Sequence, residues 1–196
     1  GNTFPVNQQV MDPAMIEKIA MELMSTDQQR LFEATMEMNL SFGVPGIGNF
    51  RVNLFRQRAS ISIVVRYILG NIPALDTLSL PPVLSELIME KRGLILIVGA
   101  TGSGKSTTIA SMLDHRNANR SGHILTVEDP IEFLFKHKKS IVNQREIGMD
   151  TADWDNALKN AMRQAPDCIL IGEIRDKQTM SAALAYAQTG HLCLAT

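Results

Sequence analysis

Residues Gly93 to Leu113, GLILIVGATGSGKSTTIASML, decide the fold of this chain. An apolar run leads into a glycine-rich segment, which is followed by one lysine, three hydroxyl side chains and a helical pattern. This order predicts a buried strand, a phosphate-binding turn and a helix. In such a turn the glycines let successive backbone N–H groups point inward, and the positive end of the helix dipole attracts an anion.

The glycine-rich segment matches the pattern G-x-x-x-x-G-K-[ST] through Gly99, Gly104, Lys105 and Ser106. The match follows a strand and opens a helix, which is the context that phosphate binding requires. Lys105 is expected to reach the β- and γ-phosphates of ATP, and the Ser106 hydroxyl is expected to ligate Mg²⁺. The predicted nucleotide-binding residues are Gly99, Ala100, Thr101, Gly102, Ser103, Gly104, Lys105, Ser106 and Thr107.

The chain from Leu94 onward alternates apolar runs with helical stretches. The runs LILIV, HILTV, CILIG and HLCLAT are continuous, which indicates strands that are buried on both faces of a parallel sheet. Helical patterns follow the glycine-rich turn and cover residues 154–164 and 176–189. Residues 83–196 are therefore predicted to form a doubly wound α/β domain with three αβα layers.

Residues 1–70 show a different pattern. Asp12 and Pro13 form a helix start, and the runs FRVNLF and SISIVVRYI alternate as half-buried strands do, with Ile61, Ile63 and Val65 expected on one face of the second run. These features predict a smaller α+β domain. Residues 71–82 hold prolines and no long apolar period, so they are expected to link the two domains. The charged side chains of the predicted strands are Arg51, Arg56, Arg58 and Arg66.

A P-loop enzyme also needs acidic side chains near the ends of neighbouring strands, to hold Mg²⁺ or to orient water. The run HILTV is followed by Glu128 and Asp129, with Glu132 three residues further on, and CILIG is followed by Glu173. All of them follow buried strands, at the edge of the sheet where ligands of α/β proteins bind. The spacing leaves open which carboxylate meets the metal and which polarises the attacking water.

The composition argues against several other classes of protein, namely nucleic-acid-binding, membrane-spanning and zinc- or disulfide-stabilised proteins. The chain has 196 residues, 45% of them hydrophobic, and a net charge of −1, whereas nucleic-acid-binding proteins usually show a basic excess. The basic run KHKK at 136–139 is interpreted as a solvated loop. No apolar run approaches the ~20 residues of a membrane span. Cys168 and Cys193 form no CxxC pair, which argues against a zinc site or a disulfide framework and fits a reducing, cytoplasmic setting.

Several longer motifs carry a resemblance to a known family. They are GATGSGKSTT, TVEDPIEF, VNQREIGMDT, ALKNAMRQAPDCILIGEIRD and TGHLCLAT. Together they make the chain similar to the secretion and pilus ATPases of the type II and type IV pilus superfamily, and in particular to the retraction ATPases of the PilT/PilU family. The stretches FLFKHKKSIVNQRE and LKNAMRQAPD resemble the PilU branch more closely.

The resemblance implies roles that the spacing left open. The stretch from Ile124 to about Phe133 corresponds to the family's Asp box, in which Glu132 is the catalytic glutamate. The segment ILIGE corresponds to the Walker B motif, which places Glu173 near Mg²⁺. Arginines of the N-terminal domain reach nucleotide phosphates in this family. The implied candidates are Arg51 and Arg66, with Arg56 and Arg58 as alternatives to Arg51.

The resemblance also implies a PAS-like N-terminal domain, a RecA-like ATPase domain and a homo-hexameric ring that drives pilus retraction and twitching motility. The implied partners are further copies of the chain, a pilus platform protein of the inner membrane and a paralogous retraction ATPase, with no nucleic acid. The implied location is the cytoplasmic side of the inner membrane, at the pilus base. The alternative functions are an accessory nucleotide-binding subunit that depends on a paralogous ATPase and, less favoured, a RecA-like nucleic-acid translocase.

Both ends of the sequence suggest a fragment. The chain begins Gly-Asn without a methionine and stops at HLCLAT, a strand-like run with no turn after it. The His box of the family would begin immediately after Thr196, and the N-terminal domain of the family begins well before Gly1. We therefore expect both predicted domains to be incomplete.

Overall fold

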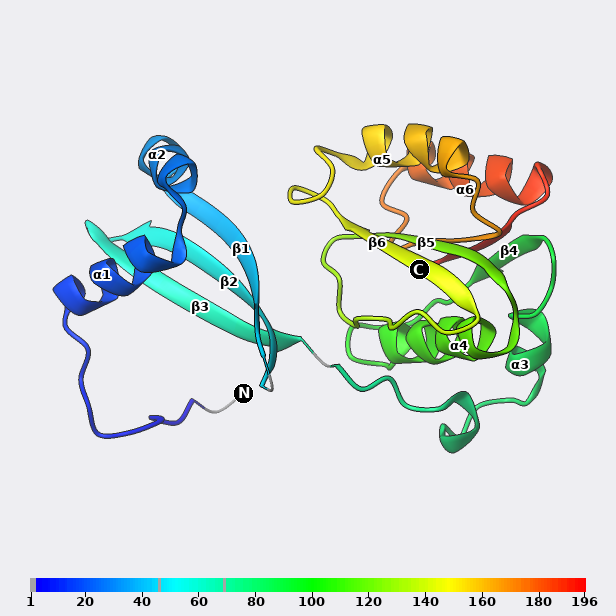
Figure 1. The fold of residues 1–196 in the computed structure, drawn as a ribbon, viewed down its shortest axis with the longest axis horizontal. Coiled ribbons are helices and arrows are strands. Elements are labelled where there is room, and N and C mark those ends of the chain that lie inside the picture. The colour runs from blue at the N-terminus through cyan, green and yellow to red at the C-terminus, as the bar shows by residue number, and fades with distance from the viewer. Residues whose placement is uncertain (1–2, 46, 69) are drawn as a thin grey trace. The chain divides into compact units, whose positions relative to one another are not determined.

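The computed structural model of the protein describes residues 3–45, 47–68 and 70–196. The chain divides into two compact units, Gly1–Ile68 and Leu69–Thr196, and Figure 1 shows the helices and strands of each. Among the described helices, none is both long enough and apolar enough to cross a membrane.

The first unit is a three-stranded antiparallel sheet with two helices. Its strands pair in the order β1-β2-β3. Both helices have a side-chain N-cap. Asp12 accepts a hydrogen bond from the backbone N–H of Met15 at the first helix, and Ser25 and Gln28 form a capping box at the second. The elements are α1 (Pro13–Leu23), α2 (Thr26–Thr35), β1 (Glu37–Val44), β2 (Gly48–Gln57) and β3 (Ser60–Ile68).

One face of this sheet holds the core of the first unit. Val52 and Leu54 of β2 are buried in a cluster with Phe32 of α2. Arg51 and the other alternate residues of β2 point to the opposite face, as the strand period requires. Val65 of β3 pairs with Val52 and so lies on this face, as the alternation predicts, but its side chain is 54% exposed. The reason is that β3 is an edge strand, paired only with β2, and its second half is exposed.

The second unit contains a five-stranded sheet in the order β4-β8-β7-β5-β6, and all of its pairs are parallel. The predicted α/β architecture with a parallel sheet is therefore confirmed. Its elements are η1 (Leu75–Thr77), α3 (Val83–Leu87), β4 (Gly93–Leu96), α4 (Lys105–Asn119), β5 (Gly122–Glu128), β6 (Ser140–Glu146), α5 (Trp154–Ala161), η2 (Met162–Gln164), β7 (Cys168–Ile171), α6 (Lys177–Gln188) and β8 (Leu192–Ala195).

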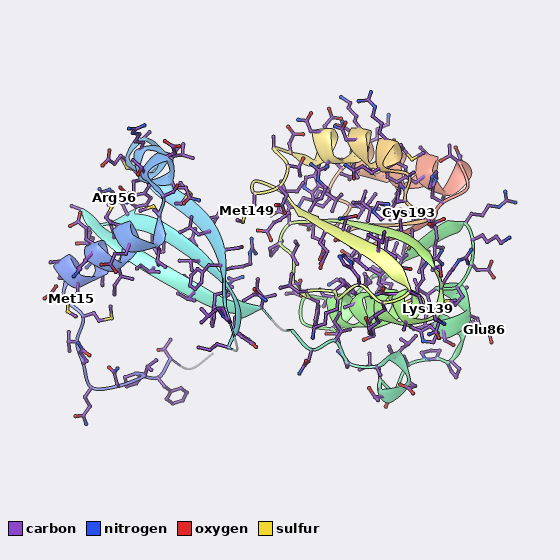
Figure 2. The ribbon with its side chains drawn as sticks, viewed as in Figure 1. Met15, Arg56, Glu86, Lys139, Met149 and Cys193 are labelled. Atoms are coloured by element: carbon purple, nitrogen blue, oxygen red, sulfur yellow. The ribbon has the colours of Figure 1, made fainter. Side chains whose placement is uncertain are left out.

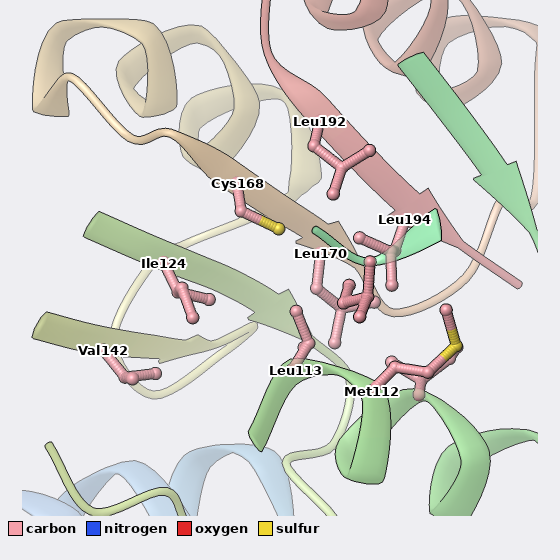
Figure 3. Packing of buried hydrophobic residues seen from close by; sticks show 10 residues of the cluster. Met112, Leu113, Ile124, Val142, Cys168, Leu170, Leu192 and Leu194 are labelled. Atoms are coloured by element: carbon pink, nitrogen blue, oxygen red, sulfur yellow. The ribbon is translucent and has the colours of Figure 1, made fainter. Parts of the chain in front are cut away.

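Helices cover both faces of this sheet, with α4 on one face and α5 and α6 on the other (Figure 1). Ile124 and Leu170 of the strands pack with Met112 and Leu113 of α4 (Figure 3). The alternate strand residues face the other layer, which explains why the sequence runs are continuously apolar. Burying one such side chain contributes ~1.5–3 kcal/mol. The cluster under α5 and α6 comprises Leu125, Leu158, Ala161, Ile169, Ile171, Ala183, Tyr186, Cys193 and Ala195.

The two edge strands differ from the sequence-based expectation. Strand β6 has no counterpart among the predicted apolar runs, because its segment SIVNQRE mixes apolar and polar residues. At the other edge, Leu96 is 44% exposed and Val98, beyond the end of β4, is 88% exposed, so the run LILIV is not buried on both faces. An edge strand has one neighbour only, and its pattern is therefore less apolar.

Candidate nucleotide-binding site

The phosphate loop, Gly99–Thr107, connects β4 to α4 and has the conformation that the glycines were expected to allow. Gly102 and Gly104 have φ angles of +78° and +94°, in the left-handed region that favours glycine. A Cβ atom on Gly99 would lie 2.7 Å from the Ser103 hydroxyl. Helix α4 begins at Lys105, so its free N–H groups and the positive end of its dipole lie at the loop.

The ammonium group of Lys105 holds the phosphate loop together. Its Nζ donates hydrogen bonds to the carbonyl oxygens of Gly99 at 2.9 Å and Ala100 at 3.1 Å. An ammonium group has three N–H donors, so these two contacts leave one for a phosphate oxygen. The lysine therefore shapes the loop in addition to carrying its positive charge.

A cavity of about 460 Å³ lies beside the phosphate loop. The ends of β5 and β7 contribute acidic side chains to its wall, and the N-terminal turn of α4 contributes hydroxyl groups. This is the carboxyl edge of the parallel strands, where α/β proteins bind ligands. The lining residues are Thr101, Gly102, Gly104, Lys105, Ser106, Thr107, Ile109, Ala110, Glu128, Asp129, Pro130, Glu132, Phe133, Phe135, Leu170, Gly172, Glu173 and Thr196.

Ser106 and Glu132 are in direct contact. The Ser106 hydroxyl donates a hydrogen bond to Glu132 Oε1 at 2.9 Å. Glu132 lies in the loop that joins β5 to β6, 26 residues from Ser106 in the sequence. A serine oxygen keeps two lone pairs when it donates its hydrogen, so Ser106 can still bind a cation while it orients Glu132.

Glu128, at the end of β5, is the buried carboxyl group of the cavity. Its Oε1 accepts hydrogen bonds from Thr126 Oγ1 at 2.6 Å and Gln144 Nε2 at 3.4 Å. Burial raises the pKa of Glu128 to about 7, although these hydrogen bonds act in the opposite direction. Gly172 at the end of β7 fits closely against it, because a Cβ atom there would lie 3.1 Å from the Glu128 Cα.

Glu173, which also lines the cavity, forms an ion pair with Arg175. The guanidinium of Arg175 also lies 3.4 Å from Asp129 Oδ2, so one arginine connects the segments that follow β5 and β7. The hydrogen bond to Glu173 is the main cause that raises the pKa of Arg175. Arg175 was not among the predicted site residues, although it lies two residues after Glu173.

The donor set of the cavity fits Mg²⁺. The Ser106 hydroxyl and the Glu173 carboxylate are hard oxygen donors, and Mg²⁺ is commonly held by one or two such groups together with substrate phosphates. Among the described residues, no group of three or more His, Cys, Asp or Glu side chains could hold a metal ion. A Mg²⁺ ion held by Ser106 and Glu173 would take its remaining ligands from nucleotide phosphates and water.

The candidate arginines lie in the first unit, and the structure separates them into two kinds. Arg51 and Arg66 are directly opposite each other on β2 and β3, and both line a hollow on the open face of the sheet, which is the face opposite α1 and α2. Arg56 belongs to the helix-covered face, with its guanidinium 5.7 Å from the ring centroid of Phe32 (Figure 2). Arg58 lies in the turn between β2 and β3, with a φ angle of +48°.

The structure brings most predicted site residues together. The phosphate loop with Lys105 and Ser106, and the acidic residues Glu132 and Glu173, surround one cavity. Gln144 and Glu146 of β6 were not among the predicted site residues, yet they contact the loop that carries Glu132. The polar segment QRE at the end of β6 could have indicated them. Polar residues near the end of a strand that pairs with β5 are candidates for contact with the site.

Comparisons with known proteins show which family the chain is similar to. A model of the family described as "Type II/IV secretion system protein" matches residues 15–196. The type IV pilus ATPase PilU of Pseudomonas aeruginosa is 47% identical over the whole of this chain and 51% of its own length. The retraction ATPase PilT of the same organism is 41% identical, again over the whole chain and over 57% of its own length. The chain thus spans about half the length of these relatives.

Solved structures of ATPases are also similar to this chain. The crystal structure of the pilus retraction motor PilT with bound ADP has a TM-score of 0.88 and 50% identity, over 92% of this chain and 52% of that one. The ATPase DotB of Legionella pneumophila has a TM-score of 0.80 and 29% identity, over 96% of this chain and 54% of its own. The resemblance inferred from the sequence motifs is confirmed.

Proposed function

Because the chain belongs to the family of type II/IV secretion system proteins, we propose that it forms the nucleotide site of an ATP-hydrolysing motor subunit of a type IV pilus machine. The reaction is Mg²⁺-dependent hydrolysis of ATP, and its output is pilus retraction and hence twitching motility. One observation carries the proposal: the phosphate loop, the Ser106–Glu132 pair and Glu173 surround a single cavity.

The phosphate loop binds the nucleotide phosphates through its backbone N–H groups and the N-terminus of α4. Lys105 directs its remaining N–H toward the β- and γ-phosphates. Mg²⁺, when bound, neutralises the charge that develops on the phosphate oxygens, and Ser106 and Glu173 are the residues that would hold it. Arg175 must release Glu173 for this role, because the two side chains are paired.

Glu132 orients a water molecule for in-line attack on the γ-phosphate. Its second carboxylate oxygen is available for this task, because Oε1 accepts the hydrogen bond from Ser106. A positioned carboxylate that accepts a proton in the transition state contributes typically about 10²–10⁴-fold to a rate. Glu128 is the second carboxyl group of the wall, and its raised pKa keeps a substantial part of it protonated near neutral pH, so it adds less negative charge beside the phosphates.

Arg51 and Arg66 are the proposed phosphate-contacting arginines of the first unit. They lie side by side on the open sheet face, whereas Arg56 stacks on Phe32. Positive groups supplied in this way can raise turnover ~10³-fold or more. If they reach the phosphates, the nucleotide state would set the angle between a PAS-like first unit and a RecA-like second unit, and a homo-hexameric ring could turn that change into work on a pilus platform protein at the inner membrane.

A second candidate function is an accessory nucleotide-binding subunit that depends on a paralogous retraction ATPase. The observation that favours it is the similarity to both PilU and PilT, two proteins that one organism carries. Turnover of the protein alone, compared with turnover in a mixture with its paralogue, separates the two functions. Hydrolysis that appears only in the mixture supports the accessory role.

The test of the proposed function is steady-state ATP hydrolysis by the natural full-length protein, with Lys105→Ala as the inactive control. Lysine-dependent turnover that rises per subunit with protein concentration supports a ring whose active sites form between copies. Tight ATP binding without turnover contradicts the motor function. Stimulation of hydrolysis by DNA would instead support a nucleic-acid translocase.

A further inference from the structure

The loop that carries Glu132 is held by two side chains of the edge strand β6. Glu146 Oε2 accepts a hydrogen bond from the backbone N–H of Ile131 at 3.0 Å, one residue before Glu132. Gln144 Nε2 donates to the carbonyl oxygen of Phe133 at 2.8 Å, one residue after Glu132. The two hydrogen bonds therefore fix the backbone on both sides of Glu132, the proposed catalytic carboxylate.

The amide of Gln144 has a partner for each of its functional groups. Its Oε1 accepts a hydrogen bond from the backbone N–H of Phe135 at 2.9 Å, and its Nε2 is also 3.4 Å from Glu128 Oε1. This pattern defines the orientation of the amide, because the opposite orientation would place two N–H groups against each other at Phe135. Gln144 thereby connects the end of β5 to the loop that carries Glu132.

Burial makes these contacts costly to lose. The Glu146 side chain is buried, with only 4% of the residue exposed, and Phe133 is 6% exposed. A buried hydrogen-bonding group that loses its partner costs more than an exposed one, since water cannot replace the partner. Glu132 itself is exposed, and its carboxylate is bound by the Ser106 hydroxyl, so its position depends on this contact and on the backbone that carries it.

We propose that Gln144 and Glu146 are positioning residues that act through Glu132: they fix the backbone of residues 131–135 and so hold the Glu132 carboxylate against Ser106 and the γ-phosphate. The inference rests on the proposed ATPase function. It assigns a catalytic consequence to an edge strand that contributes no group to the phosphate loop. A displacement of a reacting group by about 1 Å can lower a rate about 10²-fold, so the backbone contacts matter for turnover.

The first test is amide hydrogen exchange at Ile131 and Phe135, measured without nucleotide. Gln144→Met keeps the length of the side chain and removes all of its hydrogen bonds, so Phe135 exchange should accelerate ~5–10-fold. Glu146→Leu should do the same at Ile131, and Glu146→Gln, which keeps an acceptor oxygen, should not. The matched control is Asn143→Leu, the neighbouring exposed amide, which bonds to His123 instead. Unchanged exchange at both amides overturns the proposal.

The second test is kinetic and uses the natural full-length protein. Gln144→Met should lower kcat ~10–100-fold and change the Kd for ATP less than ~3-fold, since the phosphate loop is untouched. In a Glu132→Gln background the same substitution should lower kcat less than ~2-fold further, because its effect passes through Glu132. Full additivity of the two losses overturns the proposal. If Gln144→Met does not fold, Gln144→Asn withdraws the same amide by one methylene.

Different results would contradict the proposed ATPase function and the proposed positioning role of Gln144 and Glu146. Loss of Lys105 dependence of ATP binding and turnover would contradict the ATPase function, and the exchange measurement would still decide whether β6 holds the loop. Lysine-dependent hydrolysis with unchanged kcat in Gln144→Met and Glu146→Leu would leave the function intact and contradict the positioning role.

Discussion

The Ser106 hydroxyl donates a hydrogen bond to Glu132 Oε1 at 2.9 Å, so a residue of the phosphate loop is joined to the acidic loop between β5 and β6. The pair connects the proposed metal ligand to the proposed base. Because the serine oxygen retains its lone pairs, both roles are compatible at one hydroxyl. The consequences of this pairing can be measured by separate substitutions.

Substitutions at the three polar groups of the cavity should have different kinetic signatures. Glu132→Gln removes the proton acceptor and should lower kcat ~10²–10⁴-fold with little change in ATP affinity. Ser106→Ala and Glu173→Gln should instead raise the Mg²⁺ concentration needed for half-maximal turnover. Steady-state kinetics at several Mg²⁺ concentrations measure both. Intact turnover in Glu132→Gln, together with complete loss in Glu173→Gln, would exchange the roles assigned to these two carboxylates.

Lys105→Ala should weaken ATP binding ~10–100-fold, because it removes a charged hydrogen bond to phosphate. The melting temperature should change little, since the lysine bonds lie at an exposed loop. Calorimetric titration with ATP and a thermal melt measure the two quantities. The matched control is Lys139→Ala, a lysine exposed in another loop (Figure 2). Equal affinities of the two variants would show that the lysine contributes no phosphate contact.

Arg175→Ala should make Mg²⁺ binding tighter. Arg175 is paired with Glu173 and Asp129, so a cation must compete with it for the Glu173 carboxylate. Exposed ion pairs are weak, and the Mg²⁺ concentration for half-maximal nucleotide binding should therefore fall only ~2–5-fold. A fluorescent nucleotide titrated at fixed Mg²⁺ concentrations gives this value. Arg175→Lys keeps the charge and should resemble the unaltered protein; a rise in the Mg²⁺ requirement of Arg175→Ala is the contrary result.

Glu128 should make the free energy of unfolding depend on pH. Its pKa is about 7 in the folded protein against an ordinary value of 4.5, so the folded state binds more protons between these values. Stability is therefore lost as the pH rises from about 4.5 through 7, by about 3 kcal/mol from the linkage relation. Glu128→Gln, which mimics the protonated acid, should gain stability relative to the unaltered protein over this range.

Denaturant unfolding at pH 5 and pH 8 measures the effect of Glu128. The control is Glu86→Gln, an exposed glutamate that is labelled in Figure 2 and should give a difference that is the same at both pH values. Parallel stability curves for Glu128→Gln and the unaltered protein would contradict the raised pKa.

Gly172→Ala should destabilise the second unit by ~1–3 kcal/mol. Its Cβ would lie 3.1 Å from the Glu128 Cα and 3.2 Å from the carbonyl oxygen of Val127, so the backbone of β5 would have to move. Gly70→Ala is the matched control, because nothing lies within 4 Å of a Cβ atom there. Thermal melts compare the two variants. Equal stability would mean that the ends of β5 and β7 adjust freely.

The sequence by itself determined the local features of this protein. The phosphate loop needs glycines where φ is positive, and a helix must begin at its end. Both features can be recognised in the pattern at Gly99–Thr107, because they depend on neighbouring residues only. Continuous apolar runs likewise predicted a parallel sheet, because burial on both faces leaves no polar positions. The acidic candidates Glu132 and Glu173 followed from their places after such runs.

Only the tertiary structure decided how distant segments combine. Strand β6 was missed because an edge strand has one neighbour and can carry the polar residues Gln144 and Glu146. The pairing of Ser106 with Glu132, and of Arg175 with both Glu173 and Asp129, depends on which strands become neighbours, and strand order is absent from local periodicity. Side chains far apart in the sequence meet here because parallel strands end at the same edge of a sheet.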